Sequence, residues 1–221
     1  MNKSAYTASF LVVLVAASFL VLTAADDGVV VRAGDWIEYQ VTVTGNPSSD
    51  LNMTWGRIDV KNVTGPVIIV DVQTRFGNGT LFPEPNITLN VATGAIGDGF
   101  FIPTYLKVGD VYQTQYEGNI TIEGTKTIEA GGAQREVFYG SANTTTYYWD
   151  KQNGIMVQAT SELPNCTMHT KTAATNLWQP QIFGIDASTF YSLMIAAVAV
   201  LGYIVFSAVK FTLRRRKTQP N

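Results

Sequence analysis

Cys166 and His169 are the only cysteine and the only histidine in the chain, and they lie three residues apart in the stretch PNCTMHT. A thiolate and an imidazole at this spacing suggest a soft-metal site or a nucleophilic pair. The flanking residues alternate in polarity as in a strand, however, and side chains three apart on a strand point to opposite faces. A structural zinc site also needs about four ligands, and no other Cys or His exists. We therefore predict no metal site here, an inert or buried thiol at Cys166 and a solvated His169.

The same stretch contains Asn-x-Thr, the acceptor sequence for N-glycosylation, at Asn165. Six further triplets of this kind precede it, whereas the eleven asparagines between residues 26 and 186 should give only about two by chance. The alternative is that a Thr-rich β-protein with Asn-rich turns forms such triplets through composition alone. The excess favours a glycoprotein. The predicted glycosylation sites are Asn52, Asn62, Asn78, Asn86, Asn119, Asn143 and Asn165.

Signatures of the common enzyme classes are missing from the sequence. It contains no G-x-S-x-G, no H-E-x-x-H, no phosphate-binding loop and no dinucleotide-binding fingerprint. Its carboxylates are numerous but scattered, so a glycosidase-like pair such as Asp150 and Glu162 is no better supported than solvated acids on a protein surface. We therefore predict a protein that is not an enzyme and has no catalytic residue, cofactor or metal.

Two aromatic clusters are candidates for binding. Tyr147 and Trp149 alternate in YYWDKQNG, and aromatic side chains on one sheet face can stack on sugars or bind partners. Phe100 and Phe101 in FFIP are placed to line an apolar pocket under a curved sheet. The alternative for both clusters is ordinary core packing.

Alternating polarity predicts strands across residues 26–176. In WIEYQVTVT, Ile37, Tyr39 and Val41 share one face and the polar residues between them share the other. RIDVK, PVIIVDVQT, NITIEG and GIMVQAT repeat the pattern, with turn residues between them. The predicted fold is one all-β antiparallel domain of about eight to ten strands, as a curved sheet or a sandwich. Residues 94–110, glycine-rich and then aromatic, are expected to form a long connection or a cap over one end of the sheet.

Two apolar runs flank this domain. Residues 1–25 combine Lys3, an apolar run and a small-residue ending, which predicts a secretory signal peptide; the alternative is an uncleaved anchor. Residues 190–209 carry no charge and have the length of about 20 residues that a transmembrane helix needs. Because the basic motif RRRK follows, residues 210–221 are predicted to be a cytoplasmic tail and the domain to lie outside a cell membrane.

Residues 177–189 are predicted to link the domain to this helix, with Trp178 and Phe183 at the membrane interface. Small residues at Ser192, Ala196 and Ala199 share one stripe of the helix and permit pairing with another helix. The expected partners are therefore the membrane and a protein that contacts the ectodomain or the helix.

The outer domain is predicted to be acidic. It holds all seventeen acidic residues and nine of the fifteen basic ones, which gives a net charge near −8. A negative domain repels phosphate backbones, so nucleic acid is not an expected partner. A single cysteine cannot form an internal disulfide, which favours a prokaryotic or archaeal envelope over an animal cell surface.

Several phrases between Val31 and Ala159 occur in the same order in another group of proteins. These phrases are VRAGDWIEY, NVTGPVIIVDVQTRFGNGT, FFIPTYLKVGD and YYWDKQNGIMV. In them the chain resembles uncharacterised archaeal single-pass surface proteins with a Thr-rich all-β ectodomain. The resemblance implies a signal peptide and one C-terminal membrane helix, but no activity and no functional residues. A curved antiparallel sheet is also similar to periplasmic lipoprotein carriers, as a likeness of fold alone.

These observations lead to two functional hypotheses. The first is an N-glycosylated, non-catalytic surface protein that displays glycans and aromatic patches to extracellular partners. The alternative is a membrane-anchored carrier or sensor of an apolar ligand, which is held under a curved sheet and covered by residues 94–110.

Overall fold

The structure is a computed structural model that describes residues 28–93, 99–114 and 118–217, with side chains described up to Phe206. The predicted signal peptide and the first part of the predicted cap lie outside these residues.

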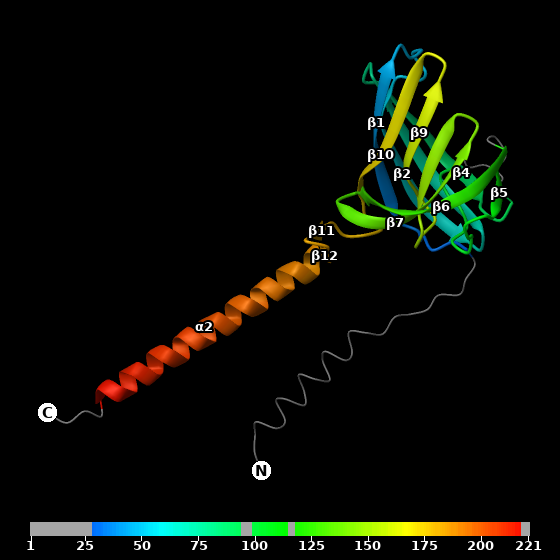
Figure 1. Cartoon of the computed structure of the whole chain (residues 1–221). Coiled ribbons are helices and arrows are strands. Elements are labelled where there is room, and N and C mark those ends of the chain that lie inside the picture. The colour runs from blue at the N-terminus through cyan, green and yellow to red at the C-terminus, as the bar shows by residue number, and fades with distance from the viewer. Residues whose placement is uncertain (1–27, 94–98, 115–117, 218–221) are drawn as a thin grey trace.

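Ten strands form one antiparallel sheet in the spatial order β4-β3-β2-β1-β10-β9-β8-β7-β6-β5 (Figure 1). Two meanders, β1 to β4 and β5 to β10, are joined by the pairing of β1 with β10. The predicted all-β antiparallel fold with a C-terminal apolar helix is confirmed, and the sheet is curved and single. Its strands are β1 (Trp36–Gly45), β2 (Met53–Thr64), β3 (Val67–Phe76), β4 (Leu81–Asn90), β5 (Val111–Thr114), β6 (Gly118–Ala130), β7 (Ala133–Ala142), β8 (Thr145–Asp150), β9 (Met156–Leu163) and β10 (Cys166–Thr175).

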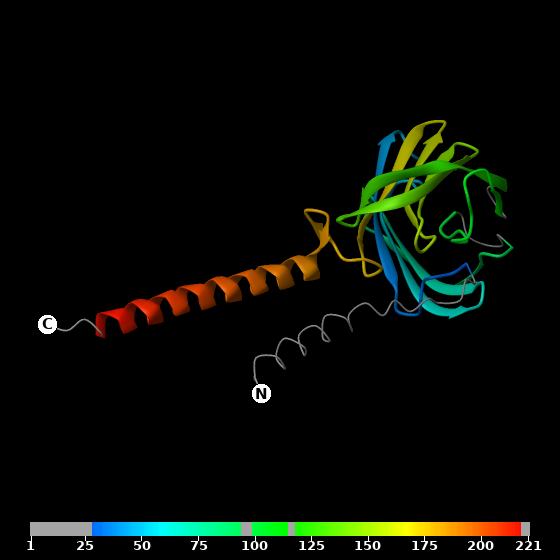
Figure 2. The same ribbon diagram turned by 60° about the horizontal axis from the view of Figure 1, so that its bottom comes forward.

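The sheet curls around its own core (Figure 2). Inward and outward residues alternate along the strands: in β1, Ile37 and Tyr39 are buried while Glu38 between them is only half-buried. Ile37 lies opposite Ile58 of β2, so apolar residues of neighbouring strands meet on the concave face. The described core is therefore made mainly by one face of this sheet, and residues outside the strands complete it.

The two ends of the curled sheet are formed by different turns. The distal end carries the β1–β2, β3–β4, β7–β8 and β9–β10 turns. The proximal end carries the β2–β3, β6–β7 and β8–β9 turns, and the chain leaves it from β10 toward the C-terminal helix (Figure 1).

Residues 99–106 cap the core at the proximal end. The backbone N–H of Ile102 donates to the carbonyl of Gly154 at 2.9 Å, and that of Met156 donates to the carbonyl of Phe100 at 2.8 Å. Gly154 has a φ of +72°, and a Cβ there would collide with the carbonyl oxygen of Ile102. Glycine therefore allows the β8–β9 turn and the cap to approach each other closely.

The segment after β10 is docked on the β6–β7 turn. Trp178 is 8% exposed, and its indole N–H donates to the carbonyl of Ala130 at 3.0 Å. The guanidinium of Arg135 lies 4.7 Å from the centre of its ring. Trp178 is thus part of the core of the domain, and its predicted place at the membrane interface is wrong because packing within the domain already buries the ring.

A small hairpin, β11 (Gln181–Ile182) and β12 (Ile185–Asp186), leads into the helix α2 (Ala187–Lys217). Among the described residues, one helix is long and apolar enough to cross a membrane: its span Ala187–Phe206 has a mean hydropathy of 2.1. α2 projects away from the sheet (Figure 1).

Candidate functional site

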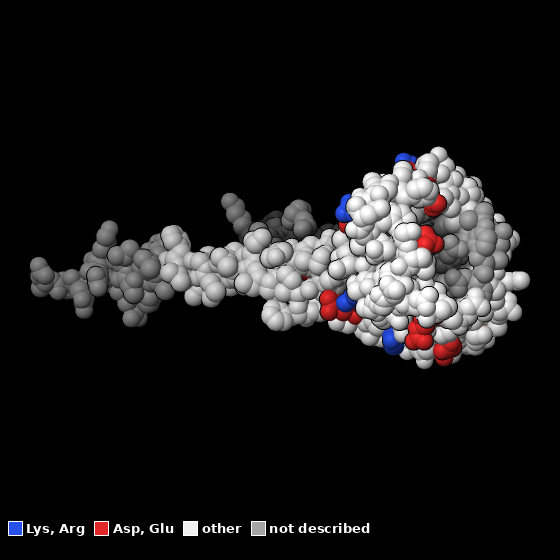
Figure 3. Space-filling view, turned by 90° about the horizontal axis from the view of Figure 1, so that it is seen from above, with Lys and Arg blue, Asp and Glu red and all other residues white. Residues whose placement is uncertain are grey.

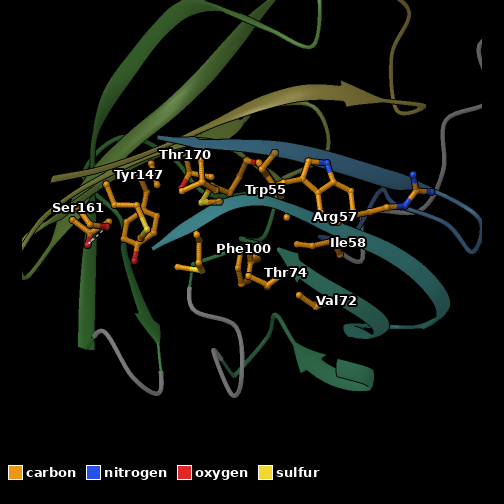
Figure 4. A pocket seen from close by; sticks show the side chains of 17 residues that line it. Trp55, Arg57, Ile58, Val72, Thr74, Phe100, Tyr147, Ser161 and Thr170 are labelled. Atoms are coloured by element: carbon orange, nitrogen blue, oxygen red, sulfur yellow. Dashed lines mark hydrogen bonds between the residues drawn. The ribbon is translucent and has the colours of Figure 1, made fainter. Parts of the chain in front are cut away.

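A cavity of about 310 Å³ lies on the concave face of the sheet. Its walls come from β1, β2, β3, β8, β9 and β10, and Phe100 of the cap also lines it (Figure 4). Figure 3 looks onto the distal end and shows the domain hollowed there, with several acidic groups around the hollow. The volume is at the lower end of the range of about 300–1,000 Å³ for small-molecule sites. The described lining residues are Tyr39, Val41, Met53, Trp55, Gly56, Arg57, Ile58, Val72, Thr74, Phe100, Thr145, Tyr147, Met156, Ala159, Ser161, Met168 and Thr170.

Small inward residues in the distal half of the sheet leave this space. Ser161 lies opposite Thr145 on β8 and Met168 on β10, while Ala159 lies opposite Tyr147 and Thr170 in the next row. On the other wall, the inward positions of β2 and β3 are Gly56 and Thr74, which face each other. The proximal half has large inward residues instead and is filled: Ile37, Ile68, Trp149 and Val157 are at most 1% exposed.

Uncharged hydroxyl groups supply polarity at the cavity wall. Thr145 Oγ1 donates to Ser161 Oγ at 2.9 Å, and both residues are buried. The phenol of Tyr39 donates to the carbonyl of Met156 at 2.7 Å. Burial raises the pKa of Tyr39 far above its ordinary value because a phenolate would lose its hydration, so the phenol is neutral at physiological pH.

Arg57 lines the cavity, but its charge is directed elsewhere. It sits on the face of β2 opposite to Ile58, and its guanidinium binds Glu38 at 2.6 Å and Asp59 at 2.7 Å. Hydrogen bonding to Asp59 is the main cause that raises the pKa of Arg57. In Figure 4 its side chain extends away from the other labelled residues. No other charged residue is among the described lining residues, so the cavity suits an uncharged group.

The four predicted aromatic binding residues fall into two pairs. Phe100 and Tyr147 line the cavity. Phe101 and Trp149 lie in the core and are not among the lining residues, and the indole N–H of Trp149 donates to the carbonyl of Gly99. Tyr147 stacks on Trp149 with 5.3 Å between ring centres, so the core residue supports the cavity residue.

Three lining methionines, Met53, Met156 and Met168, have no motif that marks them in the sequence. Methionine is unbranched and adapts its shape, which suits a wall around ligands of variable outline. To predict these methionines as lining residues, one would need to know which positions of each strand point inward and that the neighbouring inward positions hold small residues. Those inward positions depend on which strands pair.

The residues first considered for metal or nucleophilic chemistry lie apart from the cavity. Cys166 is a buried free thiol, and His169 is exposed, with its Nδ1 3.2 Å from Thr160 Oγ1. Within the described parts of the chain, no group of three or more His, Cys, Asp and Glu side chains is arranged to hold a metal ion.

Asp150 and Glu162 lie at opposite ends of the β8–β9 hairpin. Asp150 is fully buried at the proximal turn, where its carboxylate accepts a bond of 2.6 Å from Nε of Arg135. It also accepts backbone N–H bonds from Gln152 and Asn153. Asp150 therefore stabilises a turn, and it does not face Glu162 as an acid–base pair requires.

All seven predicted glycosylation asparagines are exposed. Four of them lie in or beside distal turns, one begins β6 toward the same end, and two lie along β2 and β4. Exposure permits a glycan at each site, and glycosylation remains a prediction. The four residues at the distal turns are Asn52, Asn78, Asn143 and Asn165.

Comparison with models of known protein families and with curated proteins finds no match. Among solved structures, the chain is similar to the crystal structure of the Mycobacterium tuberculosis lipoprotein LppX, with 14% sequence identity. The match has a TM-score of 0.32 and covers 64% of this chain and 86% of that chain.

Proposed function

We propose that this protein is a membrane-anchored binding protein that holds an uncharged apolar ligand, or an apolar chain of a larger one, in the cavity on the concave face. The observation that carries the proposal is the cavity itself. It is apolar, and it exists because the residues that point inward in the distal half are small. A sheet of this size can fill such a space with larger side chains, as the proximal half does. The protein acts as a carrier or a sensor and is not an enzyme.

The nature of the wall defines the class of ligand. Methionine, valine, isoleucine and aromatic groups provide apolar contact, and burial of each ligand methylene contributes about 0.8 kcal/mol. The hydroxyls of Thr145, Ser161 and Thr170 can orient an uncharged polar group. A charged group at the same depth is disfavoured, because Arg57, the one charged residue among the described lining residues, is already paired with Glu38 and Asp59.

The first test is native mass spectrometry of full-length protein released gently from its own membranes. A stoichiometric adduct of lipid-like mass supports the proposal and identifies the ligand. In a second test, the neutral fluorescent probe N-phenyl-1-naphthylamine is titrated into delipidated protein. No saturable binding, together with no adduct, would refute the proposal.

Two adjacent residues of β3 provide a matched pair of variants. Thr74 lines the cavity, and Gln73 precedes it on the opposite face of the strand. Thr74→Trp should fill the space and weaken binding of the probe by about tenfold or more, which corresponds to about 1.4 kcal/mol. Gln73→Trp adds the same indole outside the cavity and should leave binding unchanged. Equal effects of the two variants would place the probe elsewhere.

A second candidate function rests on the seven exposed Asn-x-Thr asparagines. In this function the domain is an N-glycosylated surface protein that displays glycans to partners outside the cell. Peptide mapping of native protein tests it. Occupied sites support the hypothesis, and seven unmodified asparagines contradict it. The two functions are compatible because none of these asparagines lines the cavity.

A further inference from the structure

The β11–β12 hairpin exposes an aromatic ring in a turn that is poorly suited to it. Phe183 and Gly184 form the tip and have φ values of +53° and +76°. Two-residue turns with two positive φ values favour Asn-Gly or Gly-Gly, because a side chain beyond Cβ is strained in this region. Phe183 is nevertheless 91% exposed, more than any other described large hydrophobic side chain. The hairpin itself gives no reason for phenylalanine at this position.

The position of the ring relative to α2 suggests a reason. The centre of the Phe183 ring lies 6.0 Å from that of Phe190, which lies 5.9 Å from that of Tyr191. Phe190 is in the first turn of the span Ala187–Phe206. When this span crosses a bilayer, Phe183 is therefore level with its outermost turn, the depth at which aromatic side chains gather in membrane proteins.

The same hairpin is fastened to the ectodomain. The backbone N–H of Gln181 donates to the carbonyl of Gly132 at 2.8 Å, and its Oε1 accepts from the N–H of Gln134 at 3.1 Å. On the other side, the N–H of Ala187 donates to the carbonyl of Pro180 at 2.9 Å. The hairpin is thus a short structured joint between the β6–β7 turn and the helix.

We propose that the β11–β12 hairpin is a membrane-interface anchor, with Phe183 in the outer boundary of the lipid bilayer, and that it seats the proximal end of the domain on the membrane surface. The partner is a lipid surface, because the exposed aromatic and aliphatic groups are continuous with the apolar span of α2. The distal end then faces away from the membrane. This inference depends on α2 crossing the membrane and is independent of the cavity.

Energy transfer from the ectodomain to the lipid surface tests the proposal. Full-length protein with Cys166→Ser receives one new cysteine, either Glu129→Cys beside the β6–β7 turn or Ser49→Cys in the distal β1–β2 turn; both positions are exposed. Each is labelled with a donor dye and placed in phosphatidylcholine vesicles that contain an acceptor lipid. A seated domain gives strong transfer from position 129 and weak transfer from position 49. Equal transfer from both positions overturns the proposal.

Variants of the anchor separate docking from simple tethering by the helix. Phe183→Asp should reduce transfer from position 129, because a charged side chain is excluded from the bilayer boundary, whereas Phe183→Trp should preserve it. Unchanged transfer with Phe183→Asp contradicts the anchor. The measurement is repeated in vesicles that hold one protein copy each. If transfer from position 129 is lost there but present in vesicles with several copies, a second protein copy and not the bilayer covers the hairpin, which also overturns the proposal. Near-UV circular dichroism confirms that each variant is folded.

Discussion

At the scale of single residues, the buried ion pair of Asp150 and Arg135 is expected to be a strong local determinant of stability. Asp150→Ala leaves the mostly buried guanidinium of Arg135 without its counter-ion, and we expect a loss of about 3–5 kcal/mol in the free energy of unfolding. Glu136→Ala is the control, because Glu136 pairs with Lys151 at the surface and its removal should cost less than about 1 kcal/mol. Urea titrations followed by tryptophan fluorescence measure both. Similar losses would contradict the role given to burial.

Burial of Tyr39 should make the folded domain less stable at alkaline pH. An unfolded tyrosine ionises near pH 10.0, whereas burial raises the folded pKa of Tyr39 well above this value. Its contribution is complete below pH 10 and is lost as the pH rises further, because the unfolded state releases its proton first. Desolvation raises the pKa of Tyr112 to about 12, which acts in the same direction.

We therefore expect wild-type protein to lose stability above pH 10 more steeply than Tyr39→Phe. At neutral pH the variant should be about 1 kcal/mol less stable, because the hydrogen bond to the carbonyl of Met156 is missing. Unfolding curves at pH 7 and pH 11 measure the difference between the two proteins at each pH. An equal loss in both proteins would show that Tyr39 does not carry this dependence.

At the scale of elements, Gly154 is expected to be more sensitive to substitution than a turn glycine in open space. Gly154→Ala introduces both a strained φ and a collision with the carbonyl of Ile102, whereas Gly65→Ala, at a φ of +56° in open space, introduces strain alone. Gly65→Ala should cost about 1–2 kcal/mol. Gly154→Ala should cost more and should also weaken binding of the fluorescent probe, because the cap that holds Phe100 must move. Thermal unfolding and probe titration compare the two, and equal effects would contradict close packing of the cap.

The elements that could be predicted are those with local signals. Alternation in WIEYQVTVT and PVIIVDVQT correctly predicts β1 and β3, since a half-buried strand needs only its own pattern. The pairing of β1 with β10 joins residues more than a hundred positions apart and has no local signal. The cavity depends on that pairing, because Thr170 faces Val41 only in this register. Phe100 and Tyr147 could be predicted as lining residues because aromatic clusters are visible in the sequence. The lining methionines could not, because their place in the cavity follows only from the pairing of the strands.

At the scale of the whole molecule, the proposed functions lie at different ends of the domain. The β11–β12 hairpin, the proposed membrane anchor, follows the proximal end, while the small inward residues and four of the predicted glycosylation sites belong to the distal half. The core between them is filled by large side chains. A ligand would therefore enter from the aqueous side and would not pass directly from the supporting bilayer.

This arrangement predicts how a bound probe responds to quenchers on either side of the domain. N-phenyl-1-naphthylamine bound to full-length protein in vesicles should be quenched by a water-soluble quencher such as acrylamide. It should be unaffected by lipids that carry a spin label on the acyl chain, because the filled proximal half separates the cavity from the bilayer. Thr74→Trp protein provides the background from probe dissolved in lipid. Quenching by the labelled lipids above this background would mean that the cavity faces the membrane, and the ligand would then exchange with the bilayer itself.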